Sequence, residues 1–135
     1  MSYLERDVYG MYKCDVPSGR CLMGADTLIG EQVYNKKDEE LGEIKEIMLD
    51  MRTGQVGYAV LGLGGWFSYG ERLFAIPWKA LQLDAANHRF ILDIDQNRLQ
   101  SAPSFDKDQW PDTEDPNWIR EINSFYGTEP YLMGM

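Results

Sequence analysis

Short apolar runs separated by turn residues fill the middle of the chain and predict β-strands. Alternating or continuous apolar residues over about four to eight positions mark a strand, and glycine, proline and asparagine mark turns. Several short strands at regular spacing indicate an antiparallel sandwich or barrel, and a small barrel hides its edge strands. The predicted strands are residues 29–34, 43–51, 55–63, 72–76, 83–84 and 89–93, with a tight turn at 52–54 and short helical turns at 78–81 and 96–101.

The two central strands have different patterns. Residues 55–63 are apolar at both odd and even positions, which predicts a strand covered on both faces. In residues 43–51 the apolar positions change parity between Ile44 and Ile47. Because one extra residue resets the face to which side chains point, we expect a β-bulge near Lys45-Glu46. On residues 55–63, Val56, Tyr58 and Val60 share one face, and Ala59, Leu61 and Leu63 share the other.

A helix is predicted near the end of the chain, after a polar loop at 103–115. Asp115 suits the N-cap and Pro116 the first helical position, while Gly127 suits the end of the helix. Apolar residues recur at helical spacing between them, so one stripe of this helix is expected to pack on the strands. The stripe consists of Trp118, Ile119, Ile122, Phe125 and Tyr126.

These elements divide the chain into four segments within a length of 135 residues, which fits one domain. We expect a leader at 1–24 that is flexible or docks late, a barrel at 25–101, a loop and helix at 102–131 that pack on the barrel, and a tail at 132–135. No stretch approaches the roughly twenty apolar residues that span a bilayer. The first residues also lack the uninterrupted apolar core of a signal peptide, so the predicted compartment is the cytoplasm.

The charge of the chain limits its partners. With 22 acidic and 13 basic side chains the formal net charge is −9, and the field of such a molecule repels phosphates. Direct nucleic-acid binding is therefore not expected. The two cysteines, Cys14 and Cys21, provide neither a disulfide framework nor a four-ligand zinc set, and we interpret them as ordinary thiols.

Three groups of residues are candidates for chemistry, and each has a simpler interpretation. His88, the sole histidine, lies in a predicted turn, where histidine is usually solvated. Residues 62–67 superficially resemble a dinucleotide loop, but Phe67 occupies the third glycine position. The acidic residues at 106–115 have the wrong register for a calcium loop, because Trp110 stands where a ligand belongs. The sequence predicts no catalytic, cofactor-binding or metal-binding residues, and the protein is expected not to be an enzyme.

The glycine-rich tip between the strands at 55–63 and 72–76 holds the best candidate site. Trp66, Phe67 and Tyr69 lie there on a tip too short to bury all three against itself, and exposed aromatic groups mark interfaces. The alternative is that the tip folds back onto the barrel. We interpret these three aromatic residues as candidate protein-binding residues.

An ordered series of short motifs runs along the chain from about residue 24 to residue 131. The motifs are Asp26-Thr27-Leu28-Ile29-Gly30, Leu41-Gly42-Glu43-Ile44, residues 53–60, Gly64-Gly65 and Phe74-Ala75-Ile76-Pro77-Trp78, followed by residues 102–111 and Phe125-Tyr126-Gly127. This series resembles the PRC-barrel family, whose barrel is shared by the reaction-centre H subunit of photosynthetic bacteria and by the C-terminal half of the ribosome maturation factor. The last motifs are similar to the extension of stand-alone bacterial members. The resemblance implies a barrel of about six strands that docks onto proteins, without a catalytic residue set.

The pattern and the resemblance together predict an all-β protein: a small antiparallel PRC-type β-barrel with a C-terminal α-helical extension. The leading functional hypothesis is a non-catalytic protein-binding adaptor that self-associates. One alternative is a peripheral component of a membrane-associated electron-transfer or photosynthetic reaction-centre-like assembly, held at the membrane through a partner. The other is an accessory factor in ribosome or RNA processing that acts through a ribosomal protein.

Overall fold

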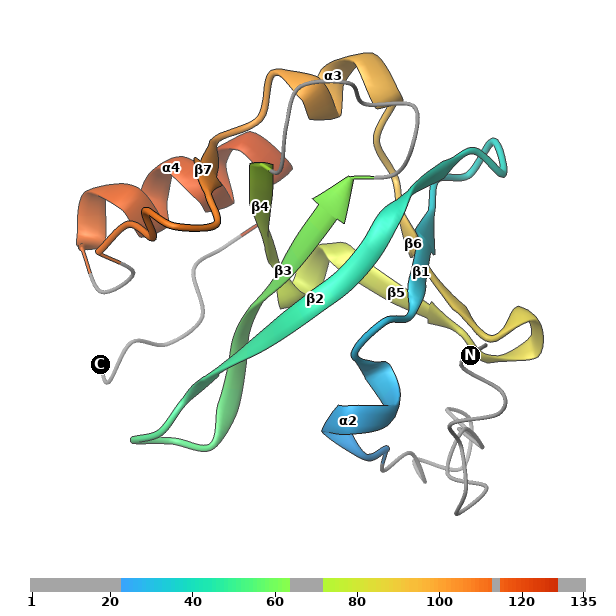
Figure 1. The fold of residues 1–135 in the computed structure, drawn as a ribbon, viewed down its shortest axis with the longest axis horizontal. Helices are drawn as coiled ribbons and strands as arrows, with labels where there is room; N and C mark the ends of the chain where they lie inside the picture. Colours follow the sequence, from blue (N-terminus) through green and yellow to red (C-terminus); the bar gives the residue numbers. More distant parts are fainter. Residues whose placement is uncertain (1–22, 64–71, 113–114, 129–135) are drawn as a thin grey trace.

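A computed structural model of the chain describes residues 23–63, 72–112 and 115–128. Within these residues, seven strands form one sheet in the order β5-β6-β1-β2-β3-β4-β7 (Figure 1). The strands are β1 Gln32–Tyr34, β2 Glu40–Asp50, β3 Gln55–Leu63, β4 Arg72–Pro77, β5 Leu81–Asp84, β6 Arg89–Leu92 and β7 Ser104–Asp106. The helices are α2 Ala25–Leu28, α3 Gln96–Gln100 and α4 Pro116–Tyr126, with single 3-10 turns η1 Trp78–Ala80 and η2 Ala85–Asn87. No helix in these ranges is long and apolar enough to cross a membrane.

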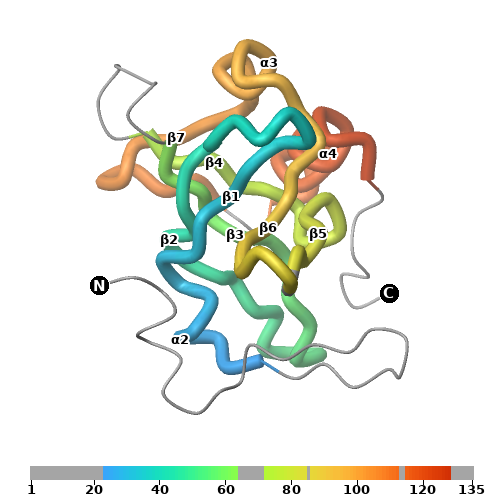
Figure 2. The backbone as a smooth tube through the Cα atoms, turned by 90° about the vertical axis from the view of Figure 1, so that its right-hand side faces the viewer, coloured from blue at the N-terminus to red at the C-terminus, as the bar shows by residue number. Residues whose placement is uncertain are grey.

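The predicted small barrel with a C-terminal helix is confirmed, with one difference in strand direction. The sheet curls around its core, and α2 and α4 lie on opposite sides of it (Figure 2). No ladder in the described part of the chain joins β5 to β7, so the sheet is not closed there. The pairing of β1 with β6 is parallel, although an antiparallel barrel was expected. The difference arises at η1, between β4 and β5. There the chain crosses to the other edge of the sheet, so β5 pairs with β6 and not with β4.

Two segments differ from the predicted elements. The strand expected at 29–34 begins only at Gln32, because the chain leaves α2 through a turn in which Gly30 has a φ of 90°. The polar loop expected at 103–115 contains the short strand β7, which extends the sheet beside β4. Arg72 on β4 holds β7 by donating hydrogen bonds to Ser104 at 2.8 Å and to Asp106 at 3.2 Å.

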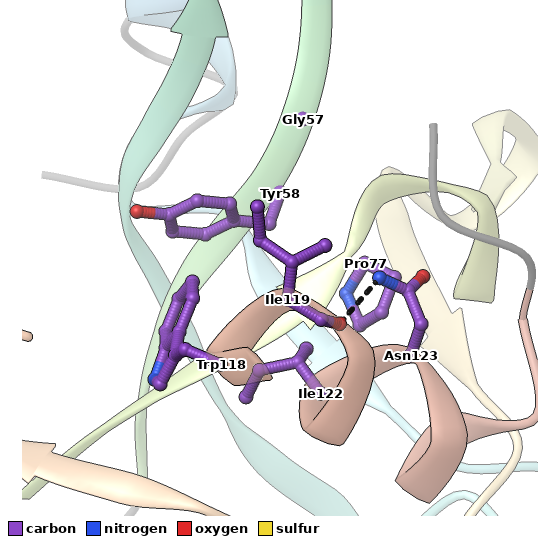
Figure 3. Close-up of a pocket in the computed structure, with 7 residues that line it drawn as sticks. All are labelled: Gly57, Tyr58, Pro77, Trp118, Ile119, Ile122 and Asn123. Atoms are coloured by element: carbon purple, nitrogen blue, oxygen red, sulfur yellow. Dashed lines mark hydrogen bonds between the residues drawn. The ribbon is translucent and has the colours of Figure 1, made fainter. Parts of the chain in front are cut away.

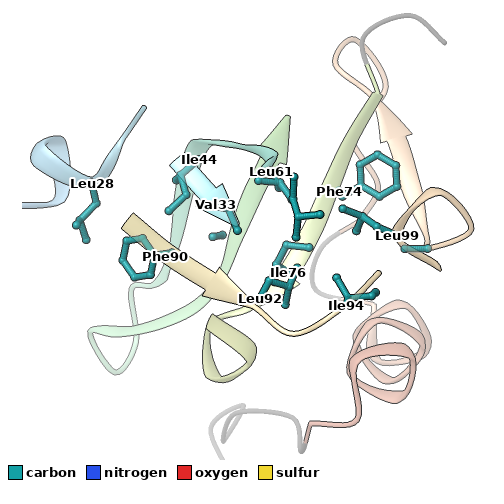
Figure 4. Close-up of a cluster of buried hydrophobic side chains, with 13 residues drawn as sticks. Leu28, Val33, Ile44, Leu61, Phe74, Ile76, Phe90, Leu92, Ile94 and Leu99 are labelled. Carbon is teal, nitrogen blue, oxygen red and sulfur yellow. The ribbon is translucent and has the colours of Figure 1, made fainter. Parts of the chain in front are cut away.

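Strand β3 separates two clusters of buried side chains, as the apolar residues at both parities predict. One face contributes Ala59 and Leu61 to the main core inside the curled sheet (Figure 4). The other face contributes Tyr58 and Val60 to a smaller core beneath α4. The strand is therefore covered on both sides along most of its length. The main core also includes Leu28, Val33, Leu41, Ile44, Phe74, Ile76, Phe90, Leu92, Ile94, Leu99 and Ala102.

The β-bulge predicted near Lys45-Glu46 is confirmed. Ile44 faces Leu61 and Glu46 faces Val60, so Lys45 is the extra residue on β2. Its insertion allows both Ile44 and Ile47 to pack against the main core although they are three positions apart.

Strands β2 and β3 leave no room for a side chain at Gly42 on β2. A Cβ atom there would fall within the van der Waals radius of the Gly62 carbonyl oxygen on β3. Only glycine fits at this position, because the backbone of the neighbouring strand occupies the space that a side chain would need.

Helix α4 begins and ends as the sequence predicts. The Asp115 carboxylate accepts a hydrogen bond of 2.9 Å from the backbone N–H of Asn117, and Pro116 follows the cap. Gly127 ends the helix in the left-handed region with a φ of 68°. Ile119 and Ile122 are buried against the sheet, so the apolar stripe packs where it was expected.

The turn between β1 and β2 is organised by a single buried side chain, Asn35. Its Oδ1 accepts hydrogen bonds from the backbone N–H groups of Lys37 and Glu39 at 2.9 and 3.0 Å. Its Nδ2 donates to the Glu39 carboxylate and to the carbonyl oxygen of Ile94, at 2.8 and 3.2 Å. This amide thus joins the turn to the segment that follows β6.

Candidate protein-binding surface

The hairpin of β2 and β3 extends beyond the strands beside it (Figure 1). The last β3 residue paired with β4 is Tyr58, and the last β2 residue paired with β1 is Glu43. Residues 48–57, here called the hairpin arm, are therefore paired only within the β2–β3 ladder among the described strands. Two strands without further neighbours are marginal in water unless other contacts hold them.

Two large apolar side chains are exposed on the hairpin arm. Leu49 is 50% exposed and Met51 is 84% exposed. Single exposed apolar residues are common, but two such residues on a projecting element form an apolar surface that a partner can cover. Methionine suits such a surface, because its flexible thioether adapts to the shape of a partner.

The turn of the arm is held in place by Asp50. Its carboxylate accepts hydrogen bonds from the Arg52 guanidinium at 3.1 and 3.2 Å and from the Arg52 backbone N–H at 2.9 Å. These bonds from Arg52 hold the pKa of Asp50 below its usual range. The Asp50 carbonyl oxygen also accepts from the N–H groups of Thr53 and Gly54, and Gly54 has a φ of 77° that favours glycine. The apolar side chains are thus presented by a preorganised turn.

The base of the arm rests against helix α4 (Figure 3). The rings of Tyr58 and Trp118 meet edge to face with centroids 5.4 Å apart. The cavity between β3 and α4 has a volume of about 10 Å³, which is the least that one water molecule needs. Asn123 turns its side-chain amide back to the Ile119 carbonyl oxygen at 2.9 Å. This contact is consequently a packed joint that supports the arm and has no room for a small molecule.

The side chain of Tyr126, the last residue of α4, packs against both the main core and the smaller core. Burial raises the pKa of Tyr126, since the charged phenolate is disfavoured away from water. Its hydroxyl makes no hydrogen bond with any residue in the described ranges. The ring instead packs edge to face on Phe125, with centroids 4.9 Å apart.

The predicted protein-binding residues Trp66, Phe67 and Tyr69 lie outside the described residues, so that assignment stays a prediction. His88 lies in the turn between β5 and β6 with a φ of 54°. Trp110 is 42% exposed and packs on Phe105, with its indole N–H donating to the Lys107 carbonyl oxygen at 2.9 Å. Among residues 23–63, 72–112 and 115–128, no three metal-ligating side chains come together.

Leu49 and Met51 were not predicted as surface residues, because their parity placed them on one face of a strand together with Ile47. The available signal was strand length. The predicted strands at 43–51 and 55–63 are longer than the neighbouring strand at 72–76, so their joined ends outrun the sheet that would cover them.

A curled sheet with one helix packed on its outer face defines a small β-barrel domain. The family model of the PRC-barrel domain matches residues 22–99, and the chain belongs to this family. The match includes β1 to β6 and ends before β7 and α4. No curated protein matches the chain.

Solved structures are similar to part of the chain, among them a Pseudomonas aeruginosa protein described as the 16S ribosomal RNA processing protein RimM, with 18% sequence identity and a TM-score of 0.41. The similarity covers 59% of this chain and 48% of that chain, so the matched part spans about half the length of that protein.

Proposed function

We propose that this PRC-barrel domain is a non-catalytic protein-binding adaptor and that it self-associates through the hairpin arm. The observation that carries the proposal is the exposure of Leu49 and Met51 on a turn fixed by Asp50. Covering a Leu or Met side chain contributes about 1.5 to 3 kcal/mol when burial is complete. A preorganised surface keeps more of that free energy, because little side-chain and loop entropy is lost on binding.

The charge distribution supports docking at the arm rather than elsewhere. The whole chain carries a formal charge of −9, so two copies repel each other on most approaches. Within the arm, residues 48–57, the charges of Asp50 and Arg52 cancel. The arm is therefore a locally neutral, apolar element on an acidic protein.

Sedimentation velocity over a wide range of protein concentration tests this proposal. We expect the wild type to associate and the double variant Leu49→Ser/Met51→Ser to remain monomeric. Trp110→Ala is the matched control, since it removes an exposed apolar side chain far along the chain from the arm. A second variant, Trp66→Ala/Phe67→Ala, tests the predicted aromatic tip in the same way. A wild type that stays monomeric throughout would refute self-association through the arm.

The cellular setting is a separate question with a separate measurement. When a cell extract is fractionated by sedimentation, we expect a cytoplasmic adaptor without its partner to be found with neither membranes nor ribosomal particles. Sedimentation with membranes would favour the peripheral electron-transfer alternative, and sedimentation with small ribosomal particles would favour the ribosome-processing alternative.

A further inference from the structure

The outer edge of β2 has no strand beside it over residues 45–50 in the described part of the chain. Strand β1 pairs with β2 only as far as Glu43, and the segment after α2 reaches Ile44 through hydrogen bonds of 2.7 and 2.9 Å. Beyond that point the N–H of Ile47 donates to the carboxylate of its own neighbour Glu46 at 3.0 Å. A charged side chain thus satisfies an edge donor that would otherwise pair with another strand.

We propose that the strand beside this edge is the same edge of a second copy, paired antiparallel about a two-fold axis at Leu49. The inference rests on the proposed function and deepens it by naming the partner and the register. An isologous contact of this kind needs a self-complementary sequence, because every contact of residue i with residue j is repeated by residue j with residue i, and only the residue on the axis meets its own counterpart.

The register centred on Leu49 is self-complementary. It places Leu49 opposite Leu49 of the second copy and Ile47 at the level of Met51, the first residue of the turn after β2. It also places Glu46 at the level of Arg52, twice, because the axis repeats each pair. Opposite-charge and apolar cross-strand pairs each stabilise a sheet by about 0.2 to 1 kcal/mol.

Registers shifted by two residues, which keep the same side chains on each face, are disfavoured by charge. A shift in one direction places Glu46 opposite Asp50, and a shift in the other places Asp50 opposite Asp50 of the second copy. Like charges directly opposite each other destabilise a strand pair.

Glu46 has two roles in this arrangement. In the separate chain its carboxylate caps the Ile47 N–H, which keeps the edge from pairing with unrelated strands. In the pair, the Ile47 N–H donates to the second copy and Glu46 turns to Arg52 of that copy. The Arg52 side chain is 64% exposed, so it is accessible from outside the molecule. Only a few ladder positions are available, and the dimer is consequently expected to be weak and concentration-dependent.

Disulfide trapping tests the axis. In a full-length Cys14→Ser/Cys21→Ser background, Leu49→Cys places two thiols on the axis, where paired Cα atoms lie about 4.5 to 5.5 Å apart, within disulfide range. With oxidised glutathione as the oxidant, we expect a covalent dimer. Met51→Cys is the matched control. Its more exposed thiols would be about 13 Å apart in this register and should remain unlinked. Equal trapping of both variants, or of neither, would overturn the register.

A charge exchange tests the pairing independently. Glu46→Arg alone sets Arg against Arg in its homodimer, and Arg52→Glu alone sets Glu against Glu. A mixture of the two variants restores both opposite-charge pairs, so we expect association only in the mixture. Circular dichroism confirms that each variant is folded. Failure of the folded variants to associate when mixed, or association of either variant alone as strong as that of the wild type, would contradict the pairing.

These results separate the inference from the proposed function. Association that depends on Leu49 and Met51 but gives no selective trapping at position 49 would leave the adaptor function intact and overturn strand pairing. A monomeric wild type would overturn both. An intramolecular disulfide from Leu49→Cys to Cys14 or Cys21, in the chain that keeps those cysteines, would assign the edge to the first residues of the same chain and would also overturn the proposal.

Discussion

The β2–β3 hairpin has two ends that share the same ladder and differ in everything around it. At the end inside the barrel, Ile44 faces Leu61, and both are only 1% exposed. At the far end, Leu49 faces Val56, and Leu49 is half exposed. Strand pairing continues through both ends, so pairing alone does not decide which residues form the core.

The difference shows how one hairpin separates stability from recognition. The inner end is covered by the main core on one side and by α4 on the other, which is where burial stabilises the fold. The outer end is covered by neither the main core nor α4. Its shape is held by hydrogen bonds that Arg52 donates to the Asp50 carboxylate within the turn. Substitutions at the inner end should therefore change folding, and substitutions at the outer end should change association.

The strongest way to break the inner end is Gly42→Ala. The new methyl group would meet the Gly62 carbonyl, and a backbone atom of a paired strand has little freedom to move. We expect the free energy of unfolding to fall by about 3 kcal/mol or more, measured by urea denaturation. Gly62→Ala is the matched control. Its methyl group meets only the flexible Lys45 side chain, so it should be much better tolerated. Equal losses for the two variants would contradict this account.

Truncating one leucine at each end of the hairpin compares the two ends directly. Leu61→Ala removes a side chain from the sealed core and should lower the free energy of unfolding by about 2 to 5 kcal/mol. Leu49→Ala removes the same atoms from a half-exposed position and should cost less than about 1 kcal/mol while weakening association. Thermal unfolding of the two variants at low protein concentration measures the contrast. Similar destabilisation by both would mean that the outer end belongs to the core.

The smallest effect is expected in the turn of the arm as the pH falls. Because the pKa of Asp50 is lower in the folded protein than in the unfolded chain, its contribution is present above the unfolded value of about 3.9 and is lost at more acidic pH. Amide proton shifts of Arg52 and Gly54 should therefore report loosening of the turn in acid, by NMR titration. Asp50→Asn should remove this dependence, and the exposed loop variant Asp108→Asn should keep it. The effect should also weaken at high salt.

Sequence alone predicts the features that depend on neighbouring residues. The parity change between Ile44 and Ile47 located the bulge, and the two-sided pattern of residues 55–63 located the strand between two cores. The cap at Asp115 and the stop at Gly127 bounded α4. Each of these signals comes from local geometry, which a short stretch of sequence specifies completely.

Features that depend on distant partners were not predictable in the same way. Strand β7 has one buried apolar residue, Phe105, and exists because β4 offers it an edge. The parallel pairing of β1 with β6 depends on how η1 redirects the chain. The exposure of Leu49 depends on where the neighbouring strands end, and no residue near Leu49 records that position. Tertiary context decides all three.

Asn35 has a further consequence for how the chain folds. Its hydrogen bond to Ile94 joins residues that are 59 positions apart. Closing a loop of that length costs the flexible chain roughly 3 to 4 kcal/mol of entropy, whereas β2 and β3 meet through a turn of a few residues. The hairpin can therefore form early, and the contact of Asn35 with Ile94 must wait until most of the sheet has assembled. We therefore expect the folding rate of this protein to be limited by a long-range closure rather than by formation of its longest ladder.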